Sequence, residues 1–285
     1  MKIGIIGGSG LYRMDGLERV GETRLETPFG DPSDAFITGT LHDREVVFLP
    51  RHGVGHRLIP SEIPFRANVW GMKQLGVTHL ISVSAVGSLK AEIEPGHIVF
   101  PDQFIDRTSL RASTFFGNGA VAHVQFGDPV CPQLVSQLAA AAVREGIDHH
   151  RGGTYVCMEG PAFSTRAESM MYRAWGGAVI GMTNLTEAKL AREAEMCFAT
   201  IALATDYDCW HESEDQVTVE AILKVMEANI AKSRRLLGEI AATMDLERPC
   251  ACREALRDGL LTPAENIPER TRNDLKPLLA RYLNG

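Results

Sequence analysis

The stretch C-F-A-T-I-A-L-A-T-D-Y-D, residues 197–208, is the clearest sign of the fold, because it has the pattern of a buried strand that ends at two acids. Residues 197–204 have the continuous apolar character of a buried strand. Asp206 and Asp208 then stand where this strand leaves the core. Side chains at i and i+2 of an extended chain point the same way, so we expect the two carboxyl groups to lie side by side at the strand end.

Outside this stretch, short apolar runs alternate with helical patterns. This alternation indicates βαβ units, and we expect an α/β fold: a single domain with a mixed, mostly parallel central sheet flanked by helices. The expected strands are residues 2–6, 46–50, 79–84, 97–100, 154–158, 178–181 and 197–204, and the expected helices include 65–76, 133–146, 184–194 and 219–243. Asn184 and Glu187 have the spacing of a capping box, which predicts a helix start there.

Two segments differ in composition from the alternating part of the chain. Residues 107–132 are rich in Thr, Ser, Gly, Phe and Asp without periodicity, which predicts a long loop that is functional or meets a neighbour. After Pro249 the sequence becomes charged and contains three further prolines. We therefore expect a catalytic domain of residues 1–248 and a C-terminal helical extension, residues 249–285, of the same domain.

The overall composition excludes several classes of partner. The chain has 285 residues, of which 45% are apolar and 23% charged, and this is ordinary usage for a soluble globular protein. Its formal net charge of -7 argues against nucleic acids and anionic membranes, but not against small anions. The first residues have the pattern of a strand and not of a signal peptide, and no apolar stretch approaches membrane-spanning length. We expect a cytoplasmic protein.

The six cysteines give little sign of a metal centre. They stand at positions 131, 157, 197, 209, 250 and 252, and we expect reduced thiols that serve as small apolar packing residues. The C-A-C sequence at 250–252 is too tight for a normal zinc knuckle, and no second pair has metal-ligand spacing, so no metal site is expected. A redox-active or stabilising vicinal pair at 250–252 stays open.

Polar residues follow several of the expected strands. Ligands of mostly parallel sheets bind outside the carboxyl ends of the strands, so these residues should share one site. They are Ser9, Arg51, His52, His56, Ser84, Thr183, Asp206 and Asp208, and the apolar Met182 stands beside Thr183. Glycine-rich turns admit an anion to backbone N–H groups, hydroxyls donate to it and arginine binds it bidentately, which together predict a phosphate site.

The glycines near the N-terminus do not predict a dinucleotide cofactor. Gly4, Gly7, Gly8 and Gly10 miss the G-x-G-x-x-G spacing, and no acid follows a second strand at the required distance. We expect no nicotinamide or flavin.

The aspartate pair is a candidate reader of a purine base. Carboxyl groups at the edge of an apolar cavity have raised pKa values, and repulsion between them raises one further. A protonated carboxyl donates to a ring nitrogen, whereas an ionised one accepts from an exocyclic amine. A solvated strand-end turn or a metal pair are the alternatives, and the metal pair lacks supporting ligands.

Motifs along residues 2–243 resemble the trimeric branch of the purine nucleoside phosphorylase superfamily. They include G-I-I-G-G-S-G (4–10), R-H-G-V-G-H (51–56), S-A-V-G-S-L (84–89), E-G-P-A-F-S-T-R-A-E (159–168), G-M-T-N-L-T-E-A-K-L-A-R-E-A-E (181–195) and A-T-D-Y-D-C-W (204–210). The resemblance implies phosphorolysis of 5'-methylthioadenosine to adenine and 5-methylthioribose 1-phosphate. Inorganic phosphate is then a co-substrate, and no cofactor is needed.

The resemblance also implies a role for each site residue. The phosphate would be bound by Ser9, Arg51, His52, Ser84, Ala85 (through its backbone) and Thr183, with His56 nearby. Met182 would pack on the sugar, Phe163 would line the base pocket, and Val219 and Ile222 would face the 5'-alkylthio group. Asp206, as general acid, would donate to N7 of adenine, and Asp208 would accept from the N6 amine. His123 would reach the site of a neighbouring subunit in a homotrimer or a dimer of trimers.

The choice of base follows from two short segments. Relatives that prefer 6-oxopurines have an asparagine where this chain has T-D-Y-D and a glutamate where it has F-S-T, so an aminopurine is favoured. Ala162, Gly181 and Thr186 depart from residues common in relatives. A phosphorylase of broader or 6-oxopurine specificity and a non-catalytic protein that binds purine nucleosides are the alternatives.

Overall fold

The strands of the protein form one mixed sheet. The structure, a computed structural model, describes residues 1–8, 10–11, 14–211 and 219–283, and only the backbone of 219–223. The strands are β1 (Lys2–Gly7), β2 (Leu17–Thr23), β3 (Phe36–Leu41), β4 (Arg44–Pro50), β5 (Val77–Ser88), β6 (Ile98–Phe100), β7 (Gln103–Arg107), β8 (His149–Arg151), β9 (Thr154–Met158), β10 (Gly177–Gly181) and β11 (Cys197–Asp206). Along β2-β3-β4-β1-β5-β10-β9-β7 each strand pairs with the next, and β11 pairs with β5 and β6. The expected α/β class with a mixed, mostly parallel sheet is confirmed.

The two longest strands organise this sheet. β5 pairs in parallel with β1 through residues 77–82 and with β11 through residues 79–87. Residues 197–204 of β11 are all buried, as the apolar run predicts. β5 and β11 therefore form the centre of the core. β5 continues to Ser88, four residues past the expected end, so Ser84 lies within the strand, and Asp206 is the last residue of β11.

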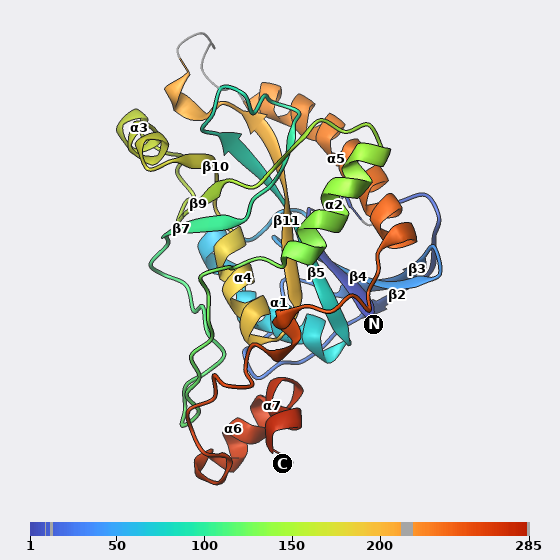
Figure 1. Ribbon diagram of the computed structural model, residues 1–285, viewed down its shortest axis with the longest axis vertical. Helices are drawn as coiled ribbons and strands as arrows, with labels where there is room; N and C mark the ends of the chain where they lie inside the picture. The colour runs from blue at the N-terminus through green and yellow to red at the C-terminus, as the bar shows by residue number, and fades with distance from the viewer. Residues whose placement is uncertain (9, 12–13, 212–218, 284–285) are drawn as a thin grey trace.

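Helices cover both faces of the sheet (Figure 1). On one face, α2 (Pro132–Arg144) packs on α5 (Val219–Thr243), and both contact β11. On the other face, α1 (Phe65–Gln74) packs on α4 (Asn184–Glu193), and both contact β5. The short α3 (Arg166–Ala174) contacts β10 and the 3-10 turn Asp208–Trp210. Each expected helix exists with ends within two residues of the prediction.

The long loop and the C-terminal extension lie together at the lower end of the molecule in Figure 1. Between Arg107 and Pro132, the described chain has two isolated β-bridges and contains neither a helix nor a strand of several residues, as expected. The extension holds the turns Ala251–Glu254 and Ala264–Asn266 and the helices α6 (Glu269–Asp274) and α7 (Lys276–Leu283). Ala122 in the loop bridges to Leu260 in the extension, so the two segments support each other.

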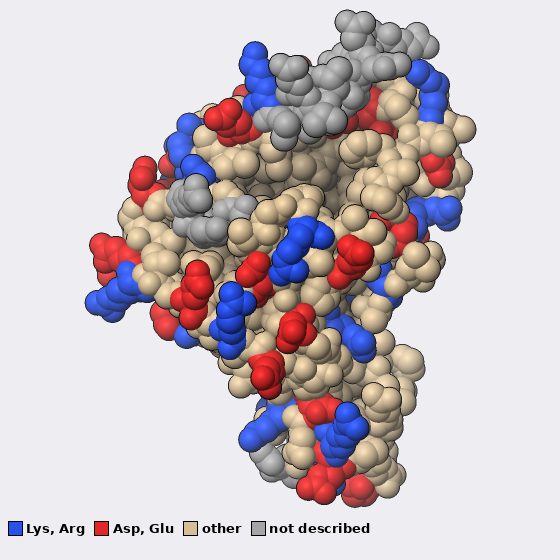
Figure 2. Space-filling view, turned by 180° about the vertical axis from the view of Figure 1, so that it is seen from behind, with Lys and Arg blue, Asp and Glu red and all other residues tan. Residues whose placement is uncertain are grey.

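On the side shown in Figure 2, charged residues of both signs are mixed over the surface. The excess negative charge is therefore not gathered into one field on that face. Within the described residues, no helix is long and apolar enough to cross a bilayer.

Candidate active site

A stretch of β5 has a partner strand on one side and none on the other. The pairing of β1 ends at Ser82, and the antiparallel pairing of β10 begins at Gly87. Residues 83–86, in the part of the chain that the structure describes, are paired with β11 alone. Such a point, where the neighbours of a strand change, is where α/β sheets bind ligands. The open edge carries Ser84 and Ala85, two of the predicted phosphate residues.

Arg51 follows β4 and is buried beneath this edge. Its Nε and Nη2 donate to the carboxylate of Glu187 at 2.5 and 3.0 Å, and Nη2 also donates to the Ser82 hydroxyl at 2.6 Å. Nη1 donates to the Val83 carbonyl oxygen at 2.8 Å, and Nη2 reaches that of Ile6 at 3.2 Å. Among the described residues, one N–H of Nη1 has no acceptor. Arg51 thus has one N–H for an anion.

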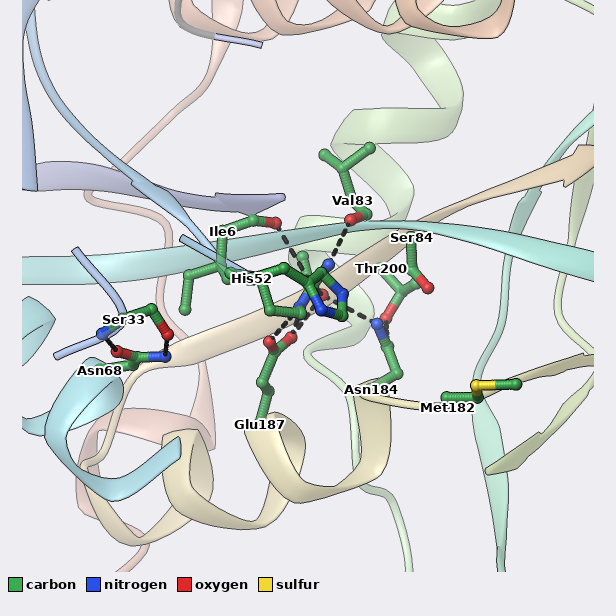
Figure 3. A network of polar contacts seen from close by, with 12 residues as sticks. Ile6, Ser33, His52, Asn68, Val83, Ser84, Met182, Asn184, Glu187 and Thr200 are labelled. Carbon is green, nitrogen blue, oxygen red and sulfur yellow. Dashed lines mark hydrogen bonds and ion pairs between the residues drawn. The ribbon is translucent and has the colours of Figure 1, made fainter. Parts of the chain in front are cut away.

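Glu187 and Asn184 project from α4 into the same network (Figure 3). The Ser82 hydroxyl donates to Glu187 at 2.6 Å and accepts from the Asn184 amide at 2.8 Å. The Asn184 oxygen accepts from the Thr200 hydroxyl. Because the positive and negative charges are paired and every partner is hydrogen-bonded, the cluster can be buried at a tolerable cost.

The predicted capping box at Asn184 is wrong. Thr183 is the N-cap residue of α4 and makes no capping hydrogen bond with its side chain. The side chains of Asn184 and Glu187 are used by the buried network instead. A capping box occurs at α3, where the Thr165 hydroxyl accepts from the Glu168 N–H and Glu168 accepts from the Thr165 N–H. The spacing of an acid after a capping residue is the same in both places, so tertiary contacts decided the outcome.

His52 is held as a neutral ring. Its Nδ1 lies 2.8 Å from the Leu58 carbonyl oxygen, which can only accept, so Nδ1 carries the proton and Nε2 offers a lone pair. Burial lowers the pKa of His52 to about 4, and the Arg51 charge lowers it in the same sense. The His56 ring stacks on it with centroids 4.2 Å apart. At neutral pH His52 can therefore accept a hydrogen bond from a hydroxyl of a bound anion.

Two hydroxyls complete this side of the site. The Ser84 hydroxyl lies 3.2 Å from that of Tyr155, and burial raises the pKa of Tyr155, which keeps the phenol neutral. Thr183 is 4% exposed at the N-terminus of α4, where backbone N–H groups favour negative charge. Figure 3 shows His52, Ser84 and Met182 around the Glu187 network, as the strand-end argument predicts.

Asp206 and Asp208 lie at the other end of the open edge. Asp206 ends β11, and its carboxylate accepts from the Thr205 hydroxyl at 2.7 Å and from the Asp208 N–H at 2.8 Å. Burial raises the pKa of both aspartates, and the charge of Asp206 raises that of Asp208 further. Among the described residues, Oδ2 of Asp208 is buried and makes no close hydrogen bond, although looser contacts of the carboxyl group with the Ser169 hydroxyl and the Cys209 N–H act to lower its pKa. The pair has the electrostatics expected of a base reader.

The expectation of an extended chain through Asp208 is wrong, because Asp208 has φ +52° and starts a 3-10 turn. The two acids still lie together, since both face Gly87 of β5. A Cβ on Gly87 would lie 3.1 Å from Asp206 Oδ1 and 3.3 Å from Asp208 Cβ. Glycine at this position allows the close approach.

Arg111 connects the loop after β7 with the segment of Met182. Its Nε donates to Glu159 at 2.9 Å, and its Nη1 donates to the Met182 carbonyl oxygen. Glu159 also accepts from the Ser109 N–H at 2.5 Å and the Ser61 hydroxyl at 2.8 Å. Burial raises the pKa of Glu159, but these hydrogen bonds outweigh it and lower that pKa to about 2. The ionised pair fixes the backbone of Met182.

The remaining predicted residues are not brought into this cluster by the single chain. Phe163 is 73% exposed, and His123 lines a separate hollow of about 490 Å³ together with Lys189 and Glu193. Their roles stay predictions. Ser9 and the side chains of Val219 and Ile222 lie outside the described residues.

Comparison with known proteins decides the family. The family described as the phosphorylase superfamily matches residues 2–242. The chain belongs to the phosphorylase superfamily.

Individual phosphorylases are similar over the full length. A protein of Geobacter sulfurreducens named S-methyl-5'-thioadenosine phosphorylase is 59% identical over 282 residues, covering 99% of each chain. A crystal structure of a methylthioadenosine phosphorylase from an antarctic soil metagenomic library has a TM-score of 0.94 at 46% identity and covers 98% of each chain. The methylthioadenosine phosphorylase of Schistosoma mansoni, solved in complex with adenine, has a TM-score of 0.85 at 36% identity, covering 90% of this chain and 96% of that one. The resemblance seen in the sequence is confirmed.

Several residues around this phosphorylase site escaped the sequence argument. Ser82, Asn184 and Glu187 form the support of Arg51, and Arg111 and Glu159 form that of Met182. A weak signal existed for α4, because Asn184 and Glu187 share one face with the apolar Ala188 and Ala191. No signal in the sequence pairs Arg111 with Glu159.

The Gly181 departure has a steric cause in this phosphorylase. A Cβ at Gly181 would lie 1.9 Å from the Tyr155 hydroxyl oxygen, so a side chain there must displace the tyrosine. We expect Gly181→Ala to lower the free energy of unfolding by about 2 kcal/mol through overpacking. The double variant Tyr155→Phe/Gly181→Ala should recover part of this loss. Urea unfolding of the wild type and the three variants measures the coupling, and strictly additive effects would contradict the clash.

Proposed function

We propose that the protein catalyses the phosphorolysis of 5'-methylthioadenosine to adenine and 5-methylthioribose 1-phosphate. The observation that carries this function is the 59% identity over 99% of both chains with an S-methyl-5'-thioadenosine phosphorylase. The protein is a pentosyltransferase of purine and methionine salvage. The T-D-Y-D segment supports the choice of an aminopurine base, because its two carboxyl groups lie together against Gly87 of β5.

Phosphate is proposed to bind along the open edge of β5 at the Arg51 end. The free N–H of Arg51 Nη1, the hydroxyls of Ser84 and Thr183 and the N–H of Ala85 would donate to its oxygens. Neutral His52 would accept the one proton of hydrogen phosphate at Nε2, with the His56 ring stacked behind it. This set orients an oxygen lone pair toward the sugar, and Ser9 is expected to join it.

The sugar and base are proposed to lie toward the aspartates. As the C1'–N9 bond breaks, its electron pair moves into the purine, and the sugar gains oxocarbenium character. Asp206, whose pKa is raised by burial, would hold a proton in the complex and give it to N7, while a phosphate oxygen forms the new bond to C1'. Asp208 accepts from the N6 amine through the carboxylate oxygen that makes no close hydrogen bond among the described residues.

The assembly is proposed to be a homotrimer in which His123 reaches a neighbouring site. The exposed His123 lies in the loop supported by the C-terminal extension, where the His123 N–H donates to the Gly259 carbonyl oxygen at 2.8 Å. In this arrangement Val219 and Ile222 of one subunit and His123 of the next would enclose the methylthio group, while Met182 and Phe163 cover the sugar and base.

Base release from four nucleosides tests the function. The protein is incubated with 5'-methylthioadenosine, adenosine, inosine and 5'-methylthioinosine, each with and without phosphate, and the free base is quantified. We expect fast release of adenine from 5'-methylthioadenosine when phosphate is present and no release when it is omitted. Faster release from inosine would move the function to a 6-oxopurine phosphorylase, and release from none would make the protein a nucleoside-binding protein.

A further inference from the structure

Four of the six cysteines meet in one cluster, although they are scattered in the sequence. Cys131 is the N-cap residue of α2, and Cys197 is the first residue of β11. In the extension, Cys250 directly precedes the turn Ala251–Glu254, and Cys252 is the second residue of that turn. Their sulfur atoms all lie within 4.8 Å of one another, and Cys197 Sγ lies 3.0 Å from Cys250 Sγ. All four are free thiols. None of them takes part in the reaction proposed above.

The dimensions and chemistry of this cysteine cluster fit one metal ion. Zinc bound by four thiolates has Zn–S distances of about 2.3 Å in a tetrahedron, which puts the sulfurs roughly 3.8 Å apart. No sulfur separation in the cluster exceeds 4.8 Å, so shifts of about 1 Å would bring the four atoms to that spacing. Four soft sulfur donors without an oxygen ligand select zinc over magnesium or calcium. We propose that Cys131, Cys197, Cys250 and Cys252 bind one structural Zn²⁺.

The surroundings of the cluster allow an ion to enter and its charge to be balanced. Cys250 and Cys252 line a hollow of about 550 Å³ that also contains Arg151 and Arg192. Each thiol that binds zinc loses its proton to solvent, so the loaded site has a formal charge of about -2. Cys131 lies at the N-terminus of the 13-residue α2, whose dipole favours a thiolate. Arg253 follows Cys252 in the chain, and its Nη2 donates to the Leu246 carbonyl oxygen.

The zinc ion would attach the C-terminal extension to the core. Cys131 and Cys197 belong to α2 and β11, whereas Cys250 and Cys252 begin the extension. The Leu256 N–H donates to the buried Glu195 at 2.9 Å, and Gly259 accepts from the His123 N–H. A Cβ at Gly259 would lie 2.8 Å from the His123 carbonyl oxygen, so the two backbones are in close contact. The ion therefore fixes the base of the segment that positions the His123 loop.

Metal content and thiol count test the site together. Untagged protein, purified without chelator, is analysed by inductively coupled plasma mass spectrometry. We expect about one zinc per chain, and six alkylatable thiols after denaturation with chelator. Cys250→Ser should lose most of the zinc, whereas the control Cys209→Ser, which alters a cysteine outside the cluster, should keep it. Chelator should lower the Tm of the wild type and leave that of Cys250→Ser unchanged.

A second measurement does not depend on the folding of a variant. Wild-type protein, stripped of metal and reloaded with Co²⁺, should show the strong visible absorption of tetrahedral cobalt thiolate, and Zn²⁺ should abolish it. Two alkylatable thiols without bound metal would show that the cluster forms two disulfides, which overturns the proposal. Six thiols with neither zinc nor cobalt bound, or iron in place of zinc, would overturn it as well.

Discussion

Asp206→Asn lowers the rate of adenine release from 5'-methylthioadenosine by about 10²–10⁴-fold, the range expected for loss of a general acid. The amide has the size of the carboxyl and can still donate a hydrogen bond to N7, but it cannot transfer a proton. The loss should therefore fall on kcat and leave the KM for the nucleoside nearly unchanged. Steady-state assays of adenine formation at saturating phosphate measure it.

The pH dependence distinguishes a proton donor from a residue that merely shapes the pocket. Burial raises the pKa of Asp206, and a general acid acts in its protonated form, so the wild-type kcat should fall as the pH rises through that pKa. Asp206→Asn should be slow at every pH and lack this fall. The matched variant Asp208→Asn keeps an oxygen that accepts from the N6 amine, and we expect a loss of about 10-fold. Equal losses in both variants would refute the separate roles.

Glu187→Gln lowers the free energy of unfolding by about 3 kcal/mol in phosphate-free buffer. Arg51 and Glu187 have side chains that are 4% and 1% exposed, and removing one partner leaves an uncompensated buried charge. The remaining cation gains a counterion when phosphate binds, if Arg51 faces the anion as proposed. Added phosphate should therefore stabilise the variant more than it stabilises the wild type.

A second ion pair on the same helix provides the control. Lys189 of α4 binds Asp106 at 2.7 Å, and both side chains are about one third exposed. Asp106→Asn should cost less than about 1 kcal/mol, because solvent screens exposed pairs. Urea unfolding compares each of the two variants with the wild type, once with phosphate and once without it. A Glu187→Gln effect as small as that of Asp106→Asn would show that the buried pair adds no more than a surface one.

The sequence predicts the core and the site well where a local pattern coincides with burial. The run at 197–204 is a fully buried strand; Arg51, which follows β4, donates to the Val83 carbonyl oxygen of β5, and Asp206, the last residue of β11, lies against Gly87 of β5. β2, β3, β7 and β8 were missed because their burial is partial or they span few residues, which leaves little apolar periodicity. α3 was missed for a similar reason, since most of its side chains are exposed.

Contacts between distant segments were beyond the reach of sequence patterns. Asn184 and Glu187 have the spacing of a capping box, but their side chains are hydrogen-bonded to Ser82 and Arg51 instead. The cysteines show the same limit, because Cys131, Cys197 and the 250–252 pair stand more than fifty residues apart and meet through the packing of α2, β11 and the extension. Spacing rules for metal ligands describe local loops and do not detect such a cluster.

In the proposed mechanism, the open edge of β5 would set the separation of the two reacting groups. Ser84 lies at its phosphate end and Gly87 at its aspartate end, and a strand rises about 3.3 Å per residue, so roughly 10 Å separates them. That span matches a sugar placed between an anion and a purine. If phosphate and base bind as proposed, one short segment of backbone would position both the nucleophile and the leaving group. Base preference can then diverge among relatives at the aspartate end without any change in the geometry of attack.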